Sequence, residues 1–228
     1  LERFGIPVSL GHDRGHLDDD MDVVSSSAVP ADTDEVLEAR VRGLPVLHRA
    51  ELLAEMVAAK RSICVAGAHG KTTTTAMVAY AATRLGLDPT WLVGGDVPQL
   101  GGNAGPGGGE LLIAEADESD GSCALLRPRI AVVTNIELDH HPRFGSDDEL
   151  RALFAGWVAS VPGDGVVLLA RAAAGDAVDV VALGRDGVDE VDHARRGREL
   201  AVVDPLTLEH RVEVEVHRPV LHVVGPQR

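Results

Sequence analysis

Cysteine, basic residues and long apolar runs are all scarce in this chain of 228 residues. The two cysteines, Cys64 and Cys123, do not make a disulfide framework, and their neighbours favour buried, reduced thiols of a cytosolic protein. Since no apolar stretch approaches membrane-spanning length and no signal peptide precedes the first predicted strand, we expect a cytoplasmic chain without a membrane partner. The 21 basic residues against 36 acidic ones give a net charge of −15, which argues against nucleic acid as a partner.

Hydrophobic residues are plentiful by comparison, at 45% of the chain, so the sequence is not that of a disordered protein. Its length allows a substantial core in one large domain or two small ones. Strands expected near 6–8, 23–24 and 45–47 alternate with helices expected over 32–42 and 49–59, which predicts a small parallel-sheet unit. The stretch Gly11–Gly15 lies in a polar segment and is interpreted as a loop.

A second unit is expected to begin at about residue 60. Its strands are predicted at 62–66, 111–115, 130–134, 165–170 and 178–183, with an amphipathic helix over 147–159. The glycine-rich stretch 101–109 is predicted to be a loop. Beyond residue 184, the segment 185–198 is charged and predicted to be exposed, and 209–216 and 219–224 alternate in the manner of strands.

The most informative stretch is Ile63–Thr75, an apolar run that ends in a glycine turn followed by a lysine and four threonines. It has the short form G-x-x-G-K-T, because Val65 stands where the longer phosphate-loop pattern has its first glycine. Backbone N–H groups at a helix N-terminus face phosphates, the lysine neutralises their charge, and the first hydroxyl reaches Mg²⁺. An ordinary strand-to-helix turn is the alternative, but four β-branched residues are a poor start for a helix. The pattern therefore favours phosphate binding.

The second feature is an apolar strand that ends in a carboxylate, at Leu111–Glu115. In a parallel sheet this edge is also where a phosphate loop lies, so Glu115 can face a triphosphate, and Mg²⁺ prefers oxygen ligands. For Asp117, Glu118 and Asp120, an acidic solvated loop is an equally good interpretation.

The third feature repeats this pattern. The apolar run Ile130–Val133 leads into T-N-I-E-L-D-H-H, which ends at His140 and His141. A lone histidine is more often a surface residue than a ligand, but two histidines after Asn, Glu and Asp at the end of a strand favour a ligand.

Together the three segments G-A-H-G-K-T-T-T-T-A-M, A-E-A-D-E-S-D-G-S and V-V-T-N-I-E-L-D-H-H resemble the central ATPase domain of the Mur ligases. The upstream V-V-S-S-S-A-V-P and R-G-L-P-V-L-H-R-A-E-L-L-A-E-M resemble the N-terminal, UDP-sugar-binding domain of that family, so the likeness covers most of residues 1–160. It implies an α/β fold, with an incomplete Rossmann-like unit over 1–59 followed by a phosphate-loop ATPase domain with a mostly parallel sheet over 60–228.

The resemblance also implies a set of site residues. The ATP phosphate loop would comprise Gly67, Ala68, His69, Gly70, Lys71, Thr72 and Thr73. One Mg²⁺ would be held by Thr72 and Glu115 and a second by Glu115 and His140, so that Lys71, Glu115 and His140 carry the catalytic roles. Ser26 and Ser27 fall where the family contacts the UDP-sugar. Family members often carry an Asp two residues after the histidine, where this chain has Pro142.

The reaction implied by the resemblance is amide ligation in peptidoglycan precursor synthesis. The γ-phosphate of ATP would pass to the lactyl carboxylate of UDP-N-acetylmuramate, and the amine of L-alanine would then attack the acyl phosphate. The family's first glycine-rich turn would lie before Leu1, and the chain stops about where a G-x-H-N signature leads to a third domain, so we expect a ligase truncated at both ends.

Three other functions remain open from the sequence. A related ligase could join a peptide to the same sugar, or glutamate to folate. An unrelated phosphate-loop kinase or GTPase is disfavoured by the E-A-D-E-S-D strand end and by the lack of a base-specificity motif. A remnant that binds Mg-ATP without catalysis would keep the motifs but form no product.

Overall fold

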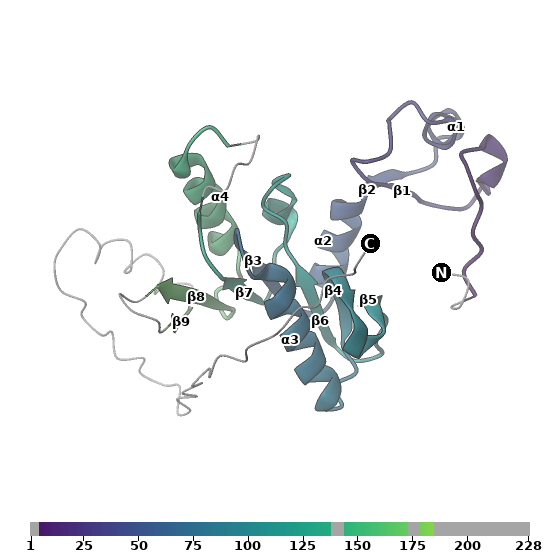
Figure 1. Ribbon diagram of the computed structural model, residues 1–228. Coiled ribbons are helices and arrows are strands. Elements are labelled where there is room, and N and C mark those ends of the chain that lie inside the picture. Colours follow the sequence, from purple (N-terminus) through teal and green to yellow (C-terminus); the bar gives the residue numbers. More distant parts are fainter. Residues whose placement is uncertain (1–4, 138–143, 173–177, 185–228) are drawn as a thin grey trace, which may run out of the picture.

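The computed structural model describes residues 5–137, 144–172 and 178–184. The described chain forms two parallel-stranded units joined by a helix (Figure 1). The first contains β1 (Val23–Ser25), α1 (Asp34–Arg42), β2 (Val46–His48) and α2 (Arg49–Ala59). The second contains β3 (Arg61–Ala66), α3 (Lys71–Arg84), β4 (Thr90–Val97), β5 (Gly102–Gly105), β6 (Leu111–Glu115), β7 (Ile130–Val133), α4 (Asp147–Ala159), β8 (Val166–Ala172) and β9 (Val178–Gly184). Short 3₁₀ turns lie at Arg14–His16, Pro98–Leu100 and Ser122–Leu125.

The first unit has the small parallel sheet that the sequence predicts. β1 pairs in parallel with β2, and α1 ends at Gly43, which adopts a φ of 69°. α2 begins at a cap in which the Glu51 carboxylate accepts from the backbone N–H of His48. The strand expected at 6–8 was wrong: this segment is irregular and exposed, and the smaller sheet contains only β1 and β2 among the described residues.

The larger sheet has the strand order β5-β4-β6-β3-β7-β8-β9. Its middle strands run parallel, while β5 and β9 pair antiparallel at the two edges. The strands predicted at 62–66, 111–115, 130–134, 165–170 and 178–183 and the helix predicted over 147–159 are all present. The charged segment 185–198 and the strands predicted at 209–216 and 219–224 lie outside the described residues.

Both faces of the sheet are covered, which explains why its strands are continuous apolar runs rather than alternating ones. On one face, α2 and α4 pack against alternate residues of the strands, including Cys64, Leu112 and Ala131. On the other face, α3 packs against Ile113 and Trp91. Figure 1 shows α3 and α4 on either side of the strands. None of the described helices is long and apolar enough to cross a membrane.

Both cysteines are buried and free, as the sequence predicts. Burial raises the pKa of the Cys64 thiol to about 12. Burial, followed by the nearby carboxylate of Glu118, raises the pKa of the Cys123 thiol to about 12. Both thiols are therefore protonated at neutral pH, which suits structural rather than reactive cysteines.

The glycine-rich stretch 101–109 was expected to be a loop, and this was wrong for its first half. Residues Gly102–Gly105 form β5 on the edge of β4, a strand that the sequence analysis did not predict. A Cβ atom on Gly105 would lie 2.4 Å from the Trp91 indole nitrogen, so glycine is required where the indole packs against β5. The strand pairing thus depends on a side chain distant in sequence.

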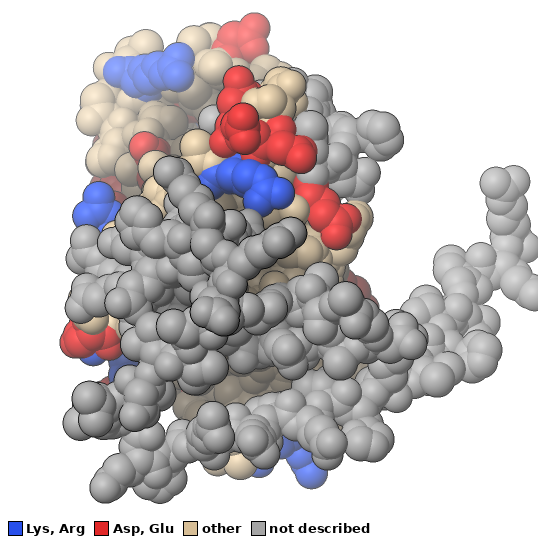
Figure 2. Space-filling model, turned by 90° about the vertical axis from the view of Figure 1, so that its left-hand side faces the viewer, with Lys and Arg blue, Asp and Glu red and all other residues tan. Residues whose placement is uncertain are grey.

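Acidic side chains dominate part of the surface. Figure 2 views the molecule from the side where α4, β8 and β9 lie, and shows acidic groups gathered near one end with basic groups between them. α4 itself begins with Asp147, Asp148 and Glu149, and negative charges at this end of a helix interact favourably with the positive end of the helix dipole. On this face, the basic side chains of the described residues do not form a continuous patch.

Lys60 connects the second half of the glycine-rich stretch to β4 through hydrogen bonds. Its ammonium donates to Thr90 Oγ1 at 2.9 Å, to the carbonyl of Gly107 at 3.2 Å and to the carbonyl of Gly109 at 2.9 Å. An ammonium group has three N–H donors, so the hydrogen bonds account for all of them.

Replacing this lysine tests its structural role. Lys60→Met keeps most of the length of the side chain but removes the ammonium donor from the carbonyl of Gly109, while the carbonyl of Gly107 and the hydroxyl of Thr90 keep the hydrogen bonds between Thr90 and Gly107. We therefore expect the free energy of unfolding to fall by about 1–3 kcal/mol. Urea denaturation followed by circular dichroism measures this loss. Arg84→Met removes an exposed cation at the end of α3 and serves as the control. Equal stability of the two variants would contradict the assigned role.

Candidate nucleotide-binding site

The candidate site lies at the carboxyl ends of three neighbouring strands. β3 lies between β6 and β7 and runs parallel to both. The loop at 67–70 follows β3, Glu115 ends β6, and Thr134 with Asn135 follows β7. Because parallel strands end at the same edge of a sheet, the three polar segments that the sequence singles out come together here.

The loop depends on two glycines with positive φ angles. Gly67 has a φ of 134°, and a Cβ atom on it would lie 2.2 Å from Thr134 Oγ1 and 2.8 Å from the carbonyl oxygen of Asn135. Gly70 has a φ of 81° and forms the N-cap of α3. No side chain of the described residues caps this helix end by a hydrogen bond, so the first amides of α3 remain available to an anion.

The tip of the loop is fixed by the residues after β7. The backbone N–H of His69 donates to Asn135 Oδ1 at 2.9 Å. The carbonyl of His69 accepts from Thr134 Oγ1 at 2.6 Å and from Asn135 Nδ2 at 2.9 Å. The loop conformation is therefore set by a neighbouring strand end and not by its own sequence alone.

Lys71 turns back from the first turn of α3 over the loop. Its Nζ donates to the carbonyl of Gly67 at 2.7 Å and to Glu118 Oε1 at 2.8 Å. The Lys71 side chain is 15% exposed and that of Glu118 is 1% exposed. The ammonium group is thus held at the mouth of the loop by a backbone carbonyl and a buried carboxylate.

Glu115 lies opposite the start of α3. Its Oε1 accepts from Thr72 Oγ1 at 3.1 Å, and its Oε2 accepts from the backbone N–H of Gly94 at 2.7 Å. A Cβ atom on Gly94 would lie 2.7 Å from the same carboxylate, so the close approach of β4 requires glycine. The structure therefore brings Thr72 and Glu115 together, as the resemblance implies.

The acidic residues after β6 have two different roles. Asp117 accepts from the backbone N–H and the hydroxyl of Ser119, and Asp120 accepts from the backbone N–H of Ser122. These are local turn contacts of the kind that shape a loop. Glu118, which lies between them, points inward to Lys71 instead.

The remaining predicted residues are less closely connected. Ala68 is half-buried and Thr73 is exposed at the start of α3. Ser26 and Ser27 follow β1 in the smaller sheet, and no hydrogen bond among the described residues joins them to the loop. His140 and His141 lie outside the described residues, as does Pro142.

Four residues that contribute to the site were not predicted from the sequence as site residues: Gly94, Glu118, Thr134 and Asn135. The quoted motifs already contained Glu118, Thr134 and Asn135, and the doublet Gly94-Gly95 after an apolar run was a signal for close backbone approach. Which of these groups point into the site depends on contacts between separate strands.

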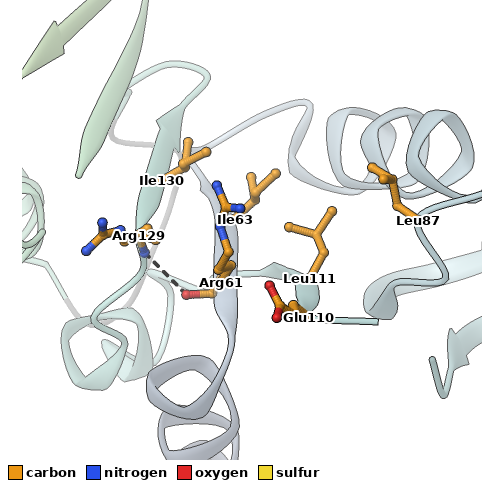
Figure 3. A pocket seen from close by; sticks show the side chains of 8 residues that line it. Arg61, Ile63, Leu87, Glu110, Leu111, Arg129 and Ile130 are labelled. Carbon is orange, nitrogen blue, oxygen red and sulfur yellow. Dashed lines mark hydrogen bonds between the residues drawn. The ribbon is translucent and has the colours of Figure 1, made fainter. Parts of the chain in front are cut away.

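A cavity of about 360 Å³ lies away from this edge (Figure 3). Arg61, Leu111 and Ile130, which line it, begin β3, β6 and β7. The backbone N–H of Arg129 donates to Ser62 Oγ beside it. The cavity is thus at the amino ends of the strands, opposite the phosphate loop, and is not part of the candidate site.

Comparisons with known proteins point to one family. Residues 1–61 match the sequence model described as Mur ligase family, catalytic domain, and residues 65–190 match the Mur ligase middle domain. Proteins named UDP-N-acetylmuramate–L-alanine ligase are similar in sequence. The one from Paenarthrobacter aurescens is 47% identical over 74% of this chain and 37% of that protein, and the one from Renibacterium salmoninarum is 43% identical over 84% and 43%.

Solved structures agree with the sequence comparison. UDP-N-acetylmuramate-alanine ligase from Thermotoga maritima has a TM-score of 0.64 and 28% identity, over 74% of this chain and 39% of that one. The UDP-N-acetylmuramate:L-alanyl-γ-D-glutamyl-meso-diaminopimelate ligase from Neisseria meningitides has a TM-score of 0.62 and 26% identity, over 79% and 71%. This chain spans about two fifths of the length of the curated relatives quoted above. The middle-domain match alone extends over more than half of the chain. The chain therefore belongs to the Mur ligase family.

Proposed function

We propose that this chain supplies the ATP-binding part, over residues 60–228, and part of the UDP-sugar-binding unit, over 1–59, of a cytoplasmic ligase in peptidoglycan precursor synthesis. The reaction is the ATP-dependent joining of L-alanine to UDP-N-acetylmuramate. The observation that carries the proposal is the meeting of Lys71, Thr72 and Glu115 around one glycine loop. The names of the relatives supply the substrates.

The loop fits the phosphates of a nucleotide. The uncapped start of α3 offers backbone N–H groups, and Lys71 adds one positive charge at the same place. Hydrogen bonds from Thr134 and Asn135 fix the loop without a ligand, so little entropy is lost when a phosphate enters.

The donor set also fits Mg²⁺. The Thr72 hydroxyl and the Glu115 carboxylate are hard oxygen ligands and already lie 3.1 Å apart. When bound, Mg²⁺ supplies positive charge that neutralises the phosphate oxygens. We assign Thr72 and Glu115 to this ion, and we keep Glu115 and His140 as the residues that would hold a second ion.

The protein residues then act by positioning and by charge. Attack of a substrate carboxylate on the γ-phosphorus of ATP gives an acyl phosphate and ADP, and the amine of L-alanine displaces the phosphate to form the amide. Lys71 stabilises negative charge on the oxygens of the phosphoryl group during the first transfer. The substrates supply the reacting carboxylate and amine, so the residues of this chain contribute orientation and charge stabilisation.

Lys71→Ala is the first test of nucleotide binding. A charge-assisted hydrogen bond is worth about 1.5–3 kcal/mol, so we expect the Kd for MgATP, measured by titration calorimetry, to rise at least tenfold. Arg84→Ala removes an exposed cation from the far end of the same helix and controls for a general change in charge. If both variants bind as tightly as the parent chain, the loop is not a phosphate site.

Gly67→Ala tests the shape of the loop. A Cβ atom cannot fit between Thr134 and Asn135, and the φ of 134° is unfavourable for alanine, so the loop must shift. We expect the melting temperature to fall by several degrees and MgATP binding to weaken at least tenfold. Gly163→Ala is the matched control because its Cβ has no atom within 4 Å and its φ is not in the strained range. Unchanged nucleotide binding by Gly67→Ala would contradict the fit.

The substrate assignment is tested by mass spectrometry of the products. The chain is incubated with ATP, Mg²⁺ and UDP-N-acetylmuramate, and with either L-alanine or the tripeptide L-alanyl-γ-D-glutamyl-meso-diaminopimelate. Because the chain spans only part of the length of its relatives, we expect it to be a poor catalyst that gives a low yield of UDP-N-acetylmuramoyl-L-alanine, and none with Lys71→Ala. A tripeptide product would instead favour the reaction named for the Neisseria structure. Nucleotide binding without either product would leave a Mg-ATP-binding function and remove the ligase assignment from this chain alone.

A further inference from the structure

Among the buried residues that the structure describes, Glu118 is the only one with a carboxylate or a basic side chain. It is 1% exposed, whereas the flanking acidic residues Asp117 and Asp120 are only half-buried. Removing a carboxylate from water is costly unless it is paired and hydrogen-bonded, so a buried glutamate requires an explanation.

Its partner is the lysine of the phosphate loop. Lys71 Nζ lies 2.8 Å from Glu118 Oε1 and 2.7 Å from the carbonyl of Gly67. These two acceptors come from different strand ends and leave one of the three N–H groups of the ammonium for another acceptor. The long lysine side chain is therefore restrained at the mouth of the loop.

We propose that Glu118 is a positioning residue that fixes the Lys71 ammonium for a phosphate oxygen, an inference that rests on the proposed nucleotide-binding function. A free lysine side chain loses much rotamer freedom when it is fixed. When Glu118 holds Lys71, the rotamer entropy of the lysine is already lost before the nucleotide binds. The affinity for the nucleotide is therefore higher than with an unrestrained lysine. Glu118 acts through Lys71 and does not itself contact the nucleotide.

The composition of the chain makes this restraint measurable. The sequence contains two lysines, Lys60 and Lys71. Selective ¹⁵N labelling of lysine therefore gives two side-chain ammonium signals by NMR. Lys60 has three acceptors remote in the fold from Glu118 and reports on folding, while Lys71 reports on the proposed restraint.

The variants are Glu118→Gln, which keeps an acceptor oxygen without the charge, and Glu118→Ala, which removes both. In Glu118→Ala, we expect the Lys71 ammonium signal to be lost to fast exchange while the Lys60 signal stays. We expect the Kd for MgATP to rise about tenfold in Glu118→Ala, from the lost restraint, and to change less than about threefold in Glu118→Gln.

Other outcomes overturn the proposal. A Lys71 signal unchanged in Glu118→Ala, or an unchanged Kd, means that the pair only stabilises the fold. If Glu118→Ala also loses the Lys60 signal and is unfolded, Glu118→Gln decides: it must keep the Lys71 signal and bind MgATP within the threefold limit, and failure of either refutes the proposal. If the parent chain does not bind MgATP, the proposed function fails, and the role of Glu118 toward phosphate fails with it. The ammonium signals then still show separately whether Glu118 restrains Lys71.

Discussion

The parallel alignment of β3 between β6 and β7 is the constraint on which the site depends. Polar residues lie at or directly after the carboxyl end of each of these strands, and the parallel alignment brings the three ends to one edge of the sheet. The strands can be continuous apolar runs only because helices cover both faces, with α2 and α4 on one side and α3 on the other. The hydrophobic layers thus place a polar site at a fixed position.

Within that edge, each neighbouring strand fixes a different part of the loop. The end of β7 fixes the tip at His69, and the end of β6 supplies Glu115 for the start of α3. The turn after β6 supplies Glu118 for the lysine. A loop fixed in this way is preorganised, which suits a reaction in which the protein contributes orientation and charge more than covalent chemistry.

The chain contains two lysines, and each has a separate structural role. Both lysines are engaged inside the structure: Lys60 binds two carbonyls and a hydroxyl, and Lys71 binds a carbonyl and a carboxylate. An ammonium is a compact charge with three donors, which suits both tasks. In a chain with net charge −15, a cation fixed beside uncapped helix amides marks a local site for an anion.

The sequence by itself determined the family resemblance, the two parallel units, the helices over 147–159 and 49–59, and Lys71 and Glu115 as neighbours of one loop. These follow from local periodicity and from motifs in which glycine, lysine and a strand-end carboxylate each have a chemical reason. The roles of the predicted site residues, among them Ser26, Ser27 and His140, stay predictions. Only the tertiary structure decided that β4 and β5 are strands, that 6–8 is not, and that Glu118 points inward while Asp117 and Asp120 shape the turn. Strand pairing and burial depend on contacts between residues that are separated in the chain, such as Trp91 with Gly105 and Lys71 with Glu118. A local sequence pattern does not predict such contacts.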